Sequence, residues 1–121
     1  TLATVTTRRD HTVQDPRVYS LSKHNCIAAC IEADRLGVDE GLMLDPHGFV
    51  ATCNSTNFFM VHSGEVWTST GEYCLNGVTR GQLSGSAGNM TFLCRKRILS
   101  LKMYILLMKY LSPALSPAKF P

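Results

Sequence analysis

The Gly77-Val78-Thr79-Arg80 step has the residue types of a helix entry that can bind an anion. The first turn of a helix leaves backbone N–H groups unpaired and carries the positive end of the helix dipole, so it attracts phosphate and carboxylate groups. Most helix starts bind only water, and this step by itself has low specificity. Asn57 precedes the most apolar run of the chain, where a ligand or a backbone group could use its side-chain amide. Both features lie in the stretch Glu40–Arg80, which therefore holds the candidate binding chemistry.

Cysteine usage argues against a disulfide scaffold and against a zinc site. The five cysteines are odd in number, and the sequence contains no CxxC pair and no Cys/His cluster. This pattern predicts reduced thiols in a cytoplasmic compartment. Cys26 and Cys30 are four residues apart on a predicted helix face, and they are interpreted as two small buried hydrophobes.

Length and composition predict one small globular domain. The chain has 121 residues, of which 45% are hydrophobic and 17% are charged. The net charge of +3 arises in the last quarter of the chain, so it does not indicate binding to nucleic acid. Residues 1–20 are polar and charged and do not form a signal peptide. The first residue is Thr1 and not a methionine, which predicts an upstream part.

A strand and a helix are expected before the binding stretch. Residues 1–6 favour a strand because Thr and Val are good strand formers. Residues 22–37 predict a helix, with Ser22 as the N-cap and Gly37 as the C-cap glycine.

The binding stretch itself predicts an antiparallel meander of four strands. Its apolar runs are separated by two turn signals, Asp45-Pro46-His47-Gly48 and Ser63-Gly64. The expected strands are 41–45, 49–53, 58–62 and 65–68. A loop over 69–74 then leads to the helix entry at Gly77.

With these motifs in order, residues 22–80 resemble the class IV aminotransferases. This pyridoxal-phosphate (PLP) family holds branched-chain aminotransferases, D-amino-acid aminotransferases and aminodeoxychorismate lyases. Asn57-Phe58-Phe59 matches an Asn followed by a hydrophobe and an aromatic, and Val66-Trp67-Thr68 matches hydrophobe-x-Thr. LNGVTR at 75–80 matches hydrophobe-x-Gly-hydrophobe-x-basic, and GVDEGLMLD at 37–45 matches the family's G-x-D-E-A-L-x-L-D strand.

The resemblance implies how several residues bind PLP. Gly77, Val78 and Thr79 match the helix entry whose backbone amides and hydroxyl hold the cofactor phosphate. Leu75 matches the residue that packs on the pyridine ring, with plain core packing as the alternative. Lys23 matches the lysine that forms a Schiff base with the cofactor, with a solvated lysine at a helix start as the alternative.

Thr52 departs from the family pattern. Five residues before the Asn of the motif, most of the family carries a Glu whose carboxylate pairs with the protonated ring nitrogen. A hydroxyl cannot hold a pyridinium proton as a carboxylate does, which makes the ring a poorer electron sink. The change predicts either chemistry different from ordinary transamination or a weakened site. The distance from Lys23 to Gly37 is also about one helical turn shorter than in the family.

The resemblance implies an α/β fold, in which this chain is a fragment of the larger cofactor-binding domain of fold-type IV PLP enzymes. The implied activity of the intact parent is PLP-dependent transamination between a small amino acid and a 2-oxo acid, of the branched-chain or D-amino-acid type. An aminodeoxychorismate-lyase-like enzyme and a non-catalytic truncated fragment are the alternatives. The parent is expected to be a cytoplasmic homodimer without nucleic-acid or membrane partners, and this chain alone is expected to be inactive.

Residues 83–121 are interpreted as an out-of-frame or alternatively spliced tail, following an upstream segment at 1–21 and a partial class IV domain at 22–82. The resemblance stops after Arg80. Shifting the reading frame by two nucleotides, with permissible codons, converts residues 102–121 into EDVYSADEVFVTGTFAGQIP, which resembles the family's continuation. The uncharged run at 103–108 is far shorter than the ~20 residues that a membrane span needs. A tail of this origin is expected to add no strands to the domain.

Overall fold

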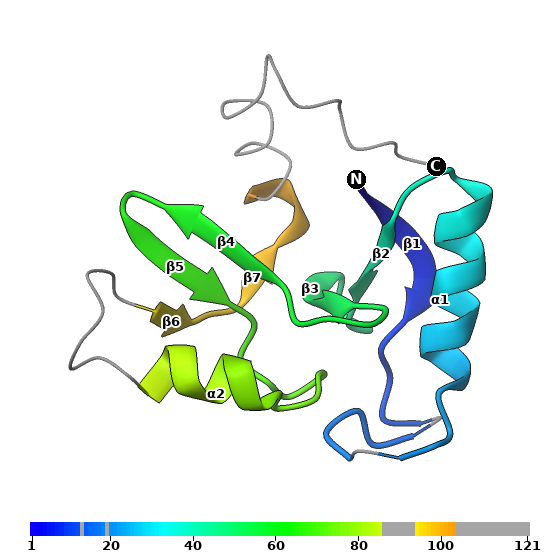
Figure 1. The fold of residues 1–121 in the computed structure, drawn as a ribbon, viewed down its shortest axis with the longest axis horizontal. Coiled ribbons are helices and arrows are strands. Elements are labelled where there is room, and N and C mark those ends of the chain that lie inside the picture. Colours follow the sequence, from blue (N-terminus) through cyan, green and yellow to red (C-terminus); the bar gives the residue numbers. More distant parts are fainter. Residues whose placement is uncertain (13, 19, 86–93, 104–121) are drawn as a thin grey trace.

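The computed structural model describes residues 1–12, 14–18, 20–85 and 94–103. The strands build two small sheets, and one helix stands before and another after a run of four strands, as Figure 1 shows. The α/β class expected from the resemblance is confirmed. The elements, in chain order, are β1 (Leu2–Arg8), α1 (His24–Arg35), β2 (Glu40–Leu44), β3 (Phe49–Cys53), β4 (Phe59–His62), β5 (Glu65–Thr68), α2 (Val78–Gly85), β6 (Cys94–Lys96) and β7 (Leu99–Ser100).

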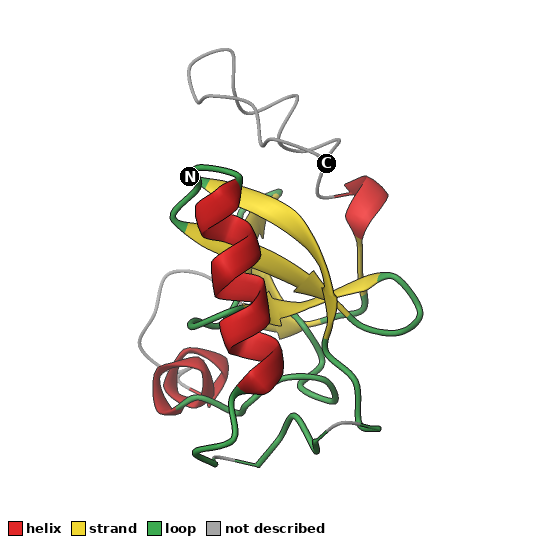
Figure 2. Ribbon diagram, turned by 90° about the vertical axis from the view of Figure 1, so that its right-hand side faces the viewer, coloured by secondary structure: helices red, strands yellow, loops and turns green. Residues whose placement is uncertain are grey.

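The first sheet has the strand order β1-β2-β3-β7, and α1 covers one of its faces (Figure 2). Strands β1 and β2 pair in parallel, so α1 is the crossover that connects them. Val5, Ala29 and Met43 form a buried cluster between the helix and these strands. A Cβ at Gly41 would lie 2.7 Å from Val5 Cγ1 and 3.1 Å from the Ala29 carbonyl oxygen, so this close packing requires glycine there.

The helix α1 is shorter than the sequence predicts. It begins at His24, and Lys23 occupies the N-cap position without a side-chain capping hydrogen bond. The assignment of Ser22 as the N-cap is therefore wrong. The C-terminal signal is confirmed, because Gly37 follows the helix with φ of 68°, a left-handed conformation that glycine adopts without strain.

The cysteines of α1 do not lie on its buried face. That face consists of Ala29 and Ala33, whose small side chains allow the helix to approach the sheet closely. Cys30 is exposed and Cys26 is half-buried, so their interpretation as two buried hydrophobes is wrong. The 56% exposure of Ile27 shows that apolar side chains also face outward on this helix.

The four central strands do not form one meander. Strands β2 and β3 belong to the first sheet, whereas β4 and β5 form the second sheet with β6, in the order β4-β5-β6. Asn54 still pairs with Gly41 and extends the β2–β3 ladder by one residue. The segment that follows makes no hairpin with β3, because it folds back on the end of that strand: Cys53 N and Thr52 Oγ1 donate to the Thr56 carbonyl oxygen at 3.0 and 2.9 Å.

Residues 94–100 add a strand to each sheet. β6 pairs in parallel with β5, and β7 pairs antiparallel with β3. The expectation that the tail adds no strands is therefore wrong for this segment. The interpretation of residues 83–121 as an out-of-frame product stays a prediction, and residues 86–93 and 104–121 lie outside the described ranges.

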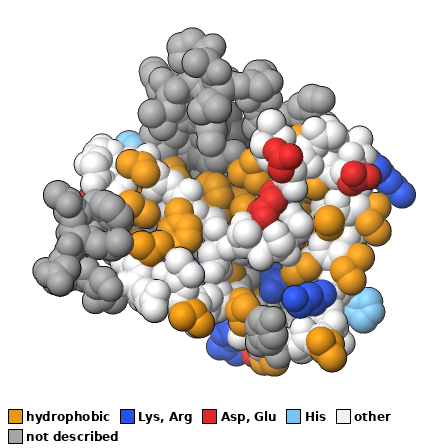
Figure 3. Space-filling model, in the orientation of Figure 1, with side chains coloured by type: hydrophobic (Ala, Val, Ile, Leu, Met, Phe, Trp, Pro, Cys, Tyr) orange, Lys and Arg blue, Asp and Glu red, His pale blue; other side chains and the backbone are white. Residues whose placement is uncertain are grey.

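One apolar core joins the two sheets. Phe58 and Trp67 from the second sheet region pack with residues of the first sheet, and the whole cluster is Leu42, Leu44, Val50, Cys53, Phe58, Trp67 and Leu99. Other hydrophobic side chains gather on the surface over the β4–β5 hairpin (Figure 3). Val61 of β4 is 61% exposed. Within the described ranges, no helix has the length and apolar character that crossing a membrane requires.

Candidate functional site

A cavity of about 320 Å³ lies between the segment that links β1 to α1, the turn after β3, and Leu75 before α2. Its volume is at the lower end of the range of ~300–1,000 Å³ that is typical of small-molecule sites. Lys23, Thr52 and Leu75 all line it, although they are far apart in the sequence. Asn57, which the sequence also singled out, lines it as well.

Lys23 stands at the N-terminal end of α1, in the cavity wall. Its backbone carbonyl accepts the first hydrogen bond of the helix, from Ile27 N at 2.8 Å. The helix therefore fixes the backbone of this residue while its side chain remains exposed. His24, the first helical residue, is also exposed. A primary amine at this place is the one candidate nucleophile that the sequence predicted for the wall.

Thr52 is the second-last residue of the strand β3 and is only 5% exposed. Its hydroxyl donates a hydrogen bond of 2.9 Å to the backbone carbonyl oxygen of Thr56. Because the hydroxyl hydrogen is used there, Thr52 offers a lone pair and no charge to the cavity. The neighbouring Cys53 thiol is not a competing nucleophile, because burial and then the Glu40 carboxylate raise its pKa to about 12.

The predicted phosphate-binding residues Gly77, Val78 and Thr79 do not line the cavity, and Val78 is 80% exposed. Only Asn76 separates them from Leu75, and they lie at the start of α2. Asn57 connects them to the wall, because its Nδ2 donates to the Leu75 carbonyl oxygen at 3.0 Å and Asn57 itself lines the cavity. The α2 entry is therefore adjacent to the cavity and held against it.

Arg9 is a wall residue that the sequence analysis missed. Its Nη1 donates to Cys26 Sγ at 2.7 Å, and its Nη2 donates to the Pro16 carbonyl oxygen at 3.4 Å. Its Nε is buried and has no hydrogen-bond partner among the described residues. Together with Lys23, it gives the wall two basic side chains against one carboxylate, that of Asp10, so the balance of charge favours an anionic ligand. No motif marks Arg9, because the polar segment around it reads as an ordinary solvated loop.

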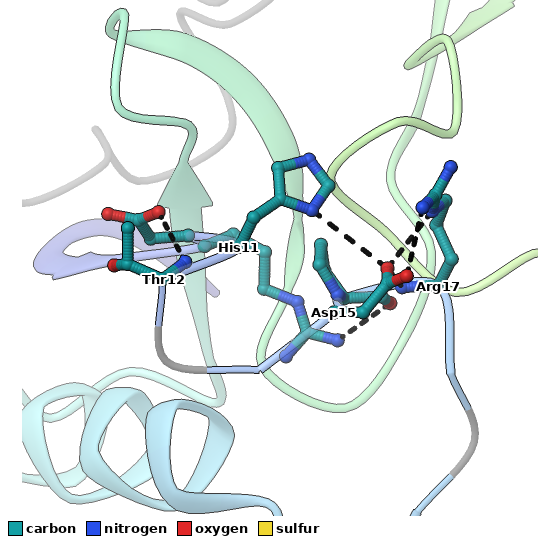
Figure 4. Close-up of polar contacts among 7 residues, drawn as sticks. His11, Thr12, Asp15 and Arg17 are labelled. Atoms are coloured by element: carbon teal, nitrogen blue, oxygen red, sulfur yellow. Dashed lines mark hydrogen bonds and ion pairs between the residues drawn. The ribbon is translucent and has the colours of Figure 1, made fainter.

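Hydrogen bonds shape the loop that closes this side of the cavity. Figure 4 shows Asp15 between His11 and Arg17. Arg17 Nε and Nη2 each donate to the Asp15 carboxylate at 2.9 Å, and these bonds lower the Asp15 pKa to about 2. The His11 ring lies 4.6 Å from the ring of Tyr73, centroid to centroid, which connects this loop to the loop before α2.

The chemistry of the wall suits an organic anion better than a metal ion. The cavity offers an amine, a guanidinium, a neutral hydroxyl and an apolar side chain, with a single carboxylate, that of Asp10. Across the described ranges, no group of three or more His, Cys, Asp or Glu side chains is arranged to hold a metal. The site can therefore bind a small, negatively charged molecule with an apolar part and present an amine to it.

Comparison with known proteins points to enzymes of one family, the class IV aminotransferases. The family model described as amino-transferase class IV matches residues 1–103, a wider range than the 22–80 of the motifs. The chain is 38% identical, over 83% of its length, to branched-chain-amino-acid aminotransferase-like protein 2 of Arabidopsis thaliana. It is 39% identical, over 67% of its length, to the branched-chain-amino-acid aminotransferase of Pseudomonas aeruginosa.

Solved structures of similar proteins share the fold. The crystal structure of the branched-chain aminotransferase from Thermoproteus uzoniensis with norvaline has a TM-score of 0.80 and 26% identity, and the match covers 87% of this chain. The PLP form of the enzyme from Thermobaculum terrenum has a TM-score of 0.76 and 25% identity, with 84% of this chain covered. The chain spans only 18% of the Arabidopsis relative, 27% of the Pseudomonas enzyme and 36% of the Thermoproteus structure.

Proposed function

Because the chain belongs to the class IV aminotransferase family, we propose that it forms one wall of a PLP site in an enzyme that transaminates branched-chain amino acids. Pyridoxal 5′-phosphate is the cofactor of this family. The observation that carries the proposal is that Lys23, Thr52 and Leu75 line one cavity. The branched-chain substrate class rests on the activity named for the relatives.

The residues of the wall fit this cofactor. Pyridoxal 5′-phosphate, when bound, supplies the carbonyl and the electron sink through which an amino acid exchanges its amino group. The Lys23 amine would hold the cofactor covalently and would carry the proton between substrate and product positions. Leu75 would contact the apolar ring and exclude water from it. Beside the wall, the backbone N–H groups of Val78 and Thr79 and the Thr79 hydroxyl would bind the phosphate, whereas the Gly77 N–H already donates to the Leu75 carbonyl oxygen at 2.9 Å.

Different activities are proposed for this chain and for a protein of the relatives' full length. Cofactor binding is proposed for these residues, which include the amine, the ring contacts and the phosphate turn. Transamination is proposed for a protein of the length of the relatives, of which this chain spans between 18% and 36%. Within the family, this reading is preferred over a lyase because the relatives are named as branched-chain aminotransferases.

Borohydride trapping tests the proposal directly. The 121-residue chain is incubated with pyridoxal 5′-phosphate, reduced with borohydride, digested, and analysed by peptide mass spectrometry. We expect one major pyridoxyl adduct, at Lys23, and its disappearance in Lys23→Ala. Lys102→Ala is the matched control, because Lys102 is an exposed lysine outside the cavity wall. An adduct spread evenly over the lysines, or unchanged in Lys23→Ala, would refute the proposed role.

A further inference from the structure

We propose that Arg80 is a positioning residue, whose buried guanidinium holds the loop 69–76 so that the α2 entry can bind a phosphate group. This inference rests on the proposed function, because it assigns Arg80 to the phosphate end of the same site. Arg80 lies on α2 itself, and it acts through the loop and not by contact with the ligand.

The burial of Arg80 demands partners. It is 1% exposed and is the largest fully buried side chain among the described residues. A charged group in such a place is costly unless hydrogen bonds compensate for its lost hydration. Three such bonds all run toward the loop and its start: Nη1 to Asn76 Oδ1 at 2.5 Å, Nη2 to the Ser69 carbonyl oxygen at 2.5 Å, and Nε to Thr68 Oγ1 at 3.4 Å.

The loop is wrapped closely around this guanidinium. Gly71 has φ of 99°, which favours glycine. A Cβ at Gly71 would lie 2.9 Å from Asn76 Oδ1, 3.1 Å from Arg80 Nη2 and 3.2 Å from Nη1. The glycine therefore lets the backbone pass directly over the charged group, and the loop has little freedom to move while Arg80 stays in place.

Asn57 holds the other end of the same loop. Its Nδ2 donates to the Leu75 carbonyl oxygen at 3.0 Å, and a Cβ at Gly77 would lie 2.4 Å from its Oδ1. Arg80 and Asn57 thus fix the segment between Ser69 and Gly77 by hydrogen bonds at both of its ends. Because Asn57 lines the cavity, these bonds set the position of the α2 entry relative to the cavity.

A lysine cannot replace Arg80 in this role. The guanidinium is a planar fork with five donors, and it reaches Ser69, Asn76 and Thr68 at the same time. An ammonium at the end of a lysine keeps the charge but cannot reproduce that divergent geometry. Arg80→Lys is therefore expected to loosen the loop while leaving the net charge unchanged.

The test compares two ligands that differ only in the phosphate. Dissociation constants of the full 121-residue chain are measured for pyridoxal 5′-phosphate and for pyridoxal, with thermal unfolding recorded in parallel. In Arg80→Lys we expect the affinity for the phosphate ester to fall about tenfold or more, the scale of a lost hydrogen bond to a charged group. The affinity for pyridoxal is expected to stay within about twofold.

Two further variants keep the test decisive. Asn76→Ala removes one partner of Arg80 on an exposed residue, so it reports on the loop even if Arg80→Lys fails to fold. Arg95→Lys is the control, because Arg95 is exposed, pairs with Glu65 and lies outside the cavity wall. Equal weakening of both ligands in Arg80→Lys and Asn76→Ala would show a merely structural role and overturn the inference. A wild-type chain that does not prefer the phosphate ester would instead contradict the proposed function itself.

Discussion

Leu99 of β7 pairs with Val50 of β3, and both side chains are buried in the core, with exposed fractions of 1% and 3%. The contact joins a residue near the end of the described chain to the sheet that carries Thr52. Residues 94–100 are therefore part of the same folded unit as the cavity wall, whatever their coding origin.

This pairing predicts that Leu99→Ala destabilises the domain. Truncation of a fully buried leucine typically costs about 2–5 kcal/mol, since apolar contacts are lost and a cavity remains. The neighbouring residue provides a matched control, because Ile98 is 68% exposed and Ile98→Ala should change stability by less than about 0.5 kcal/mol. Urea unfolding of the three proteins measures both effects. Equal stabilities for the two variants would place the tail outside the cooperative fold.

Local patterns predicted the elements better than their assembly. The helix near 22–37 and the strands from 41 to 68 follow from periodicity and from turn signals such as Ser63-Gly64. The division into two sheets does not, because it depends on how the segment after β3 folds back on the end of that strand, where the Thr56 carbonyl oxygen accepts from Cys53 N and Thr52 Oγ1. The pairing of β7 with β3 joins residues that are far apart in the sequence. The interpretation of the tail as an out-of-frame product excluded this pairing.

Thr52 leads to a prediction about the cofactor ring. Its hydroxyl hydrogen is committed to the Thr56 carbonyl oxygen, so it cannot hold a pyridinium as a carboxylate would. With ¹⁵N-labelled pyridoxal 5′-phosphate, we expect the ring nitrogen of the bound cofactor to resonate as a neutral pyridine in the wild type and to move toward the protonated value in Thr52→Glu. Ser22→Glu adds a carboxylate to the same cavity wall and is the control. A protonated ring nitrogen in the wild type would contradict this assignment.

Glu32 makes the stability of the α1–β1 contact depend on pH. Burial alone would raise its pKa, but hydrogen bonds from the backbone and side chains of Thr6 and Thr7 outweigh burial, and the pKa is lowered. A lowered pKa in the folded state adds stability above the unfolded value, and this stability is lost as the pH falls through the folded pKa.

We therefore expect the wild type to lose more unfolding free energy than Glu32→Gln when the pH is lowered from 7 to 4. Thr6 N donates to Glu32 Oε1 at 2.6 Å, and Gln can accept that bond but carries no titrating charge. Chemical denaturation at a series of pH values measures the two slopes. Glu72→Gln, at an exposed position, should keep the wild-type slope. Parallel slopes for the wild type and Glu32→Gln would rule out this contribution.

The motifs led to part of the candidate site. Lys23, Thr52 and Leu75 were singled out from the family pattern and line one cavity, whereas the motif residues Gly77–Thr79 lie outside its wall. Arg9 was missed because its place in the wall depends on contacts with Cys26 and Pro16, which no motif encodes. The role of Arg80 was also hidden, since a basic residue at a helix start looks the same whether it is solvated or 1% exposed.

The cavity wall combines segments from the region before α1, the end of β3 and the loop before α2. It exists only when all of them have reached their native positions, so a ligand that fills it binds the folded chain and not the unfolded chain. Occupancy and folding are then thermodynamically linked: at one hundred times its dissociation constant, such a ligand stabilises the native state by about 2.7 kcal/mol. Against the roughly 5–15 kcal/mol of a typical domain, this is a large share. For a chain of this size, a ligand that fills the cavity therefore contributes to the stability of the native state on the scale of a buried core side chain.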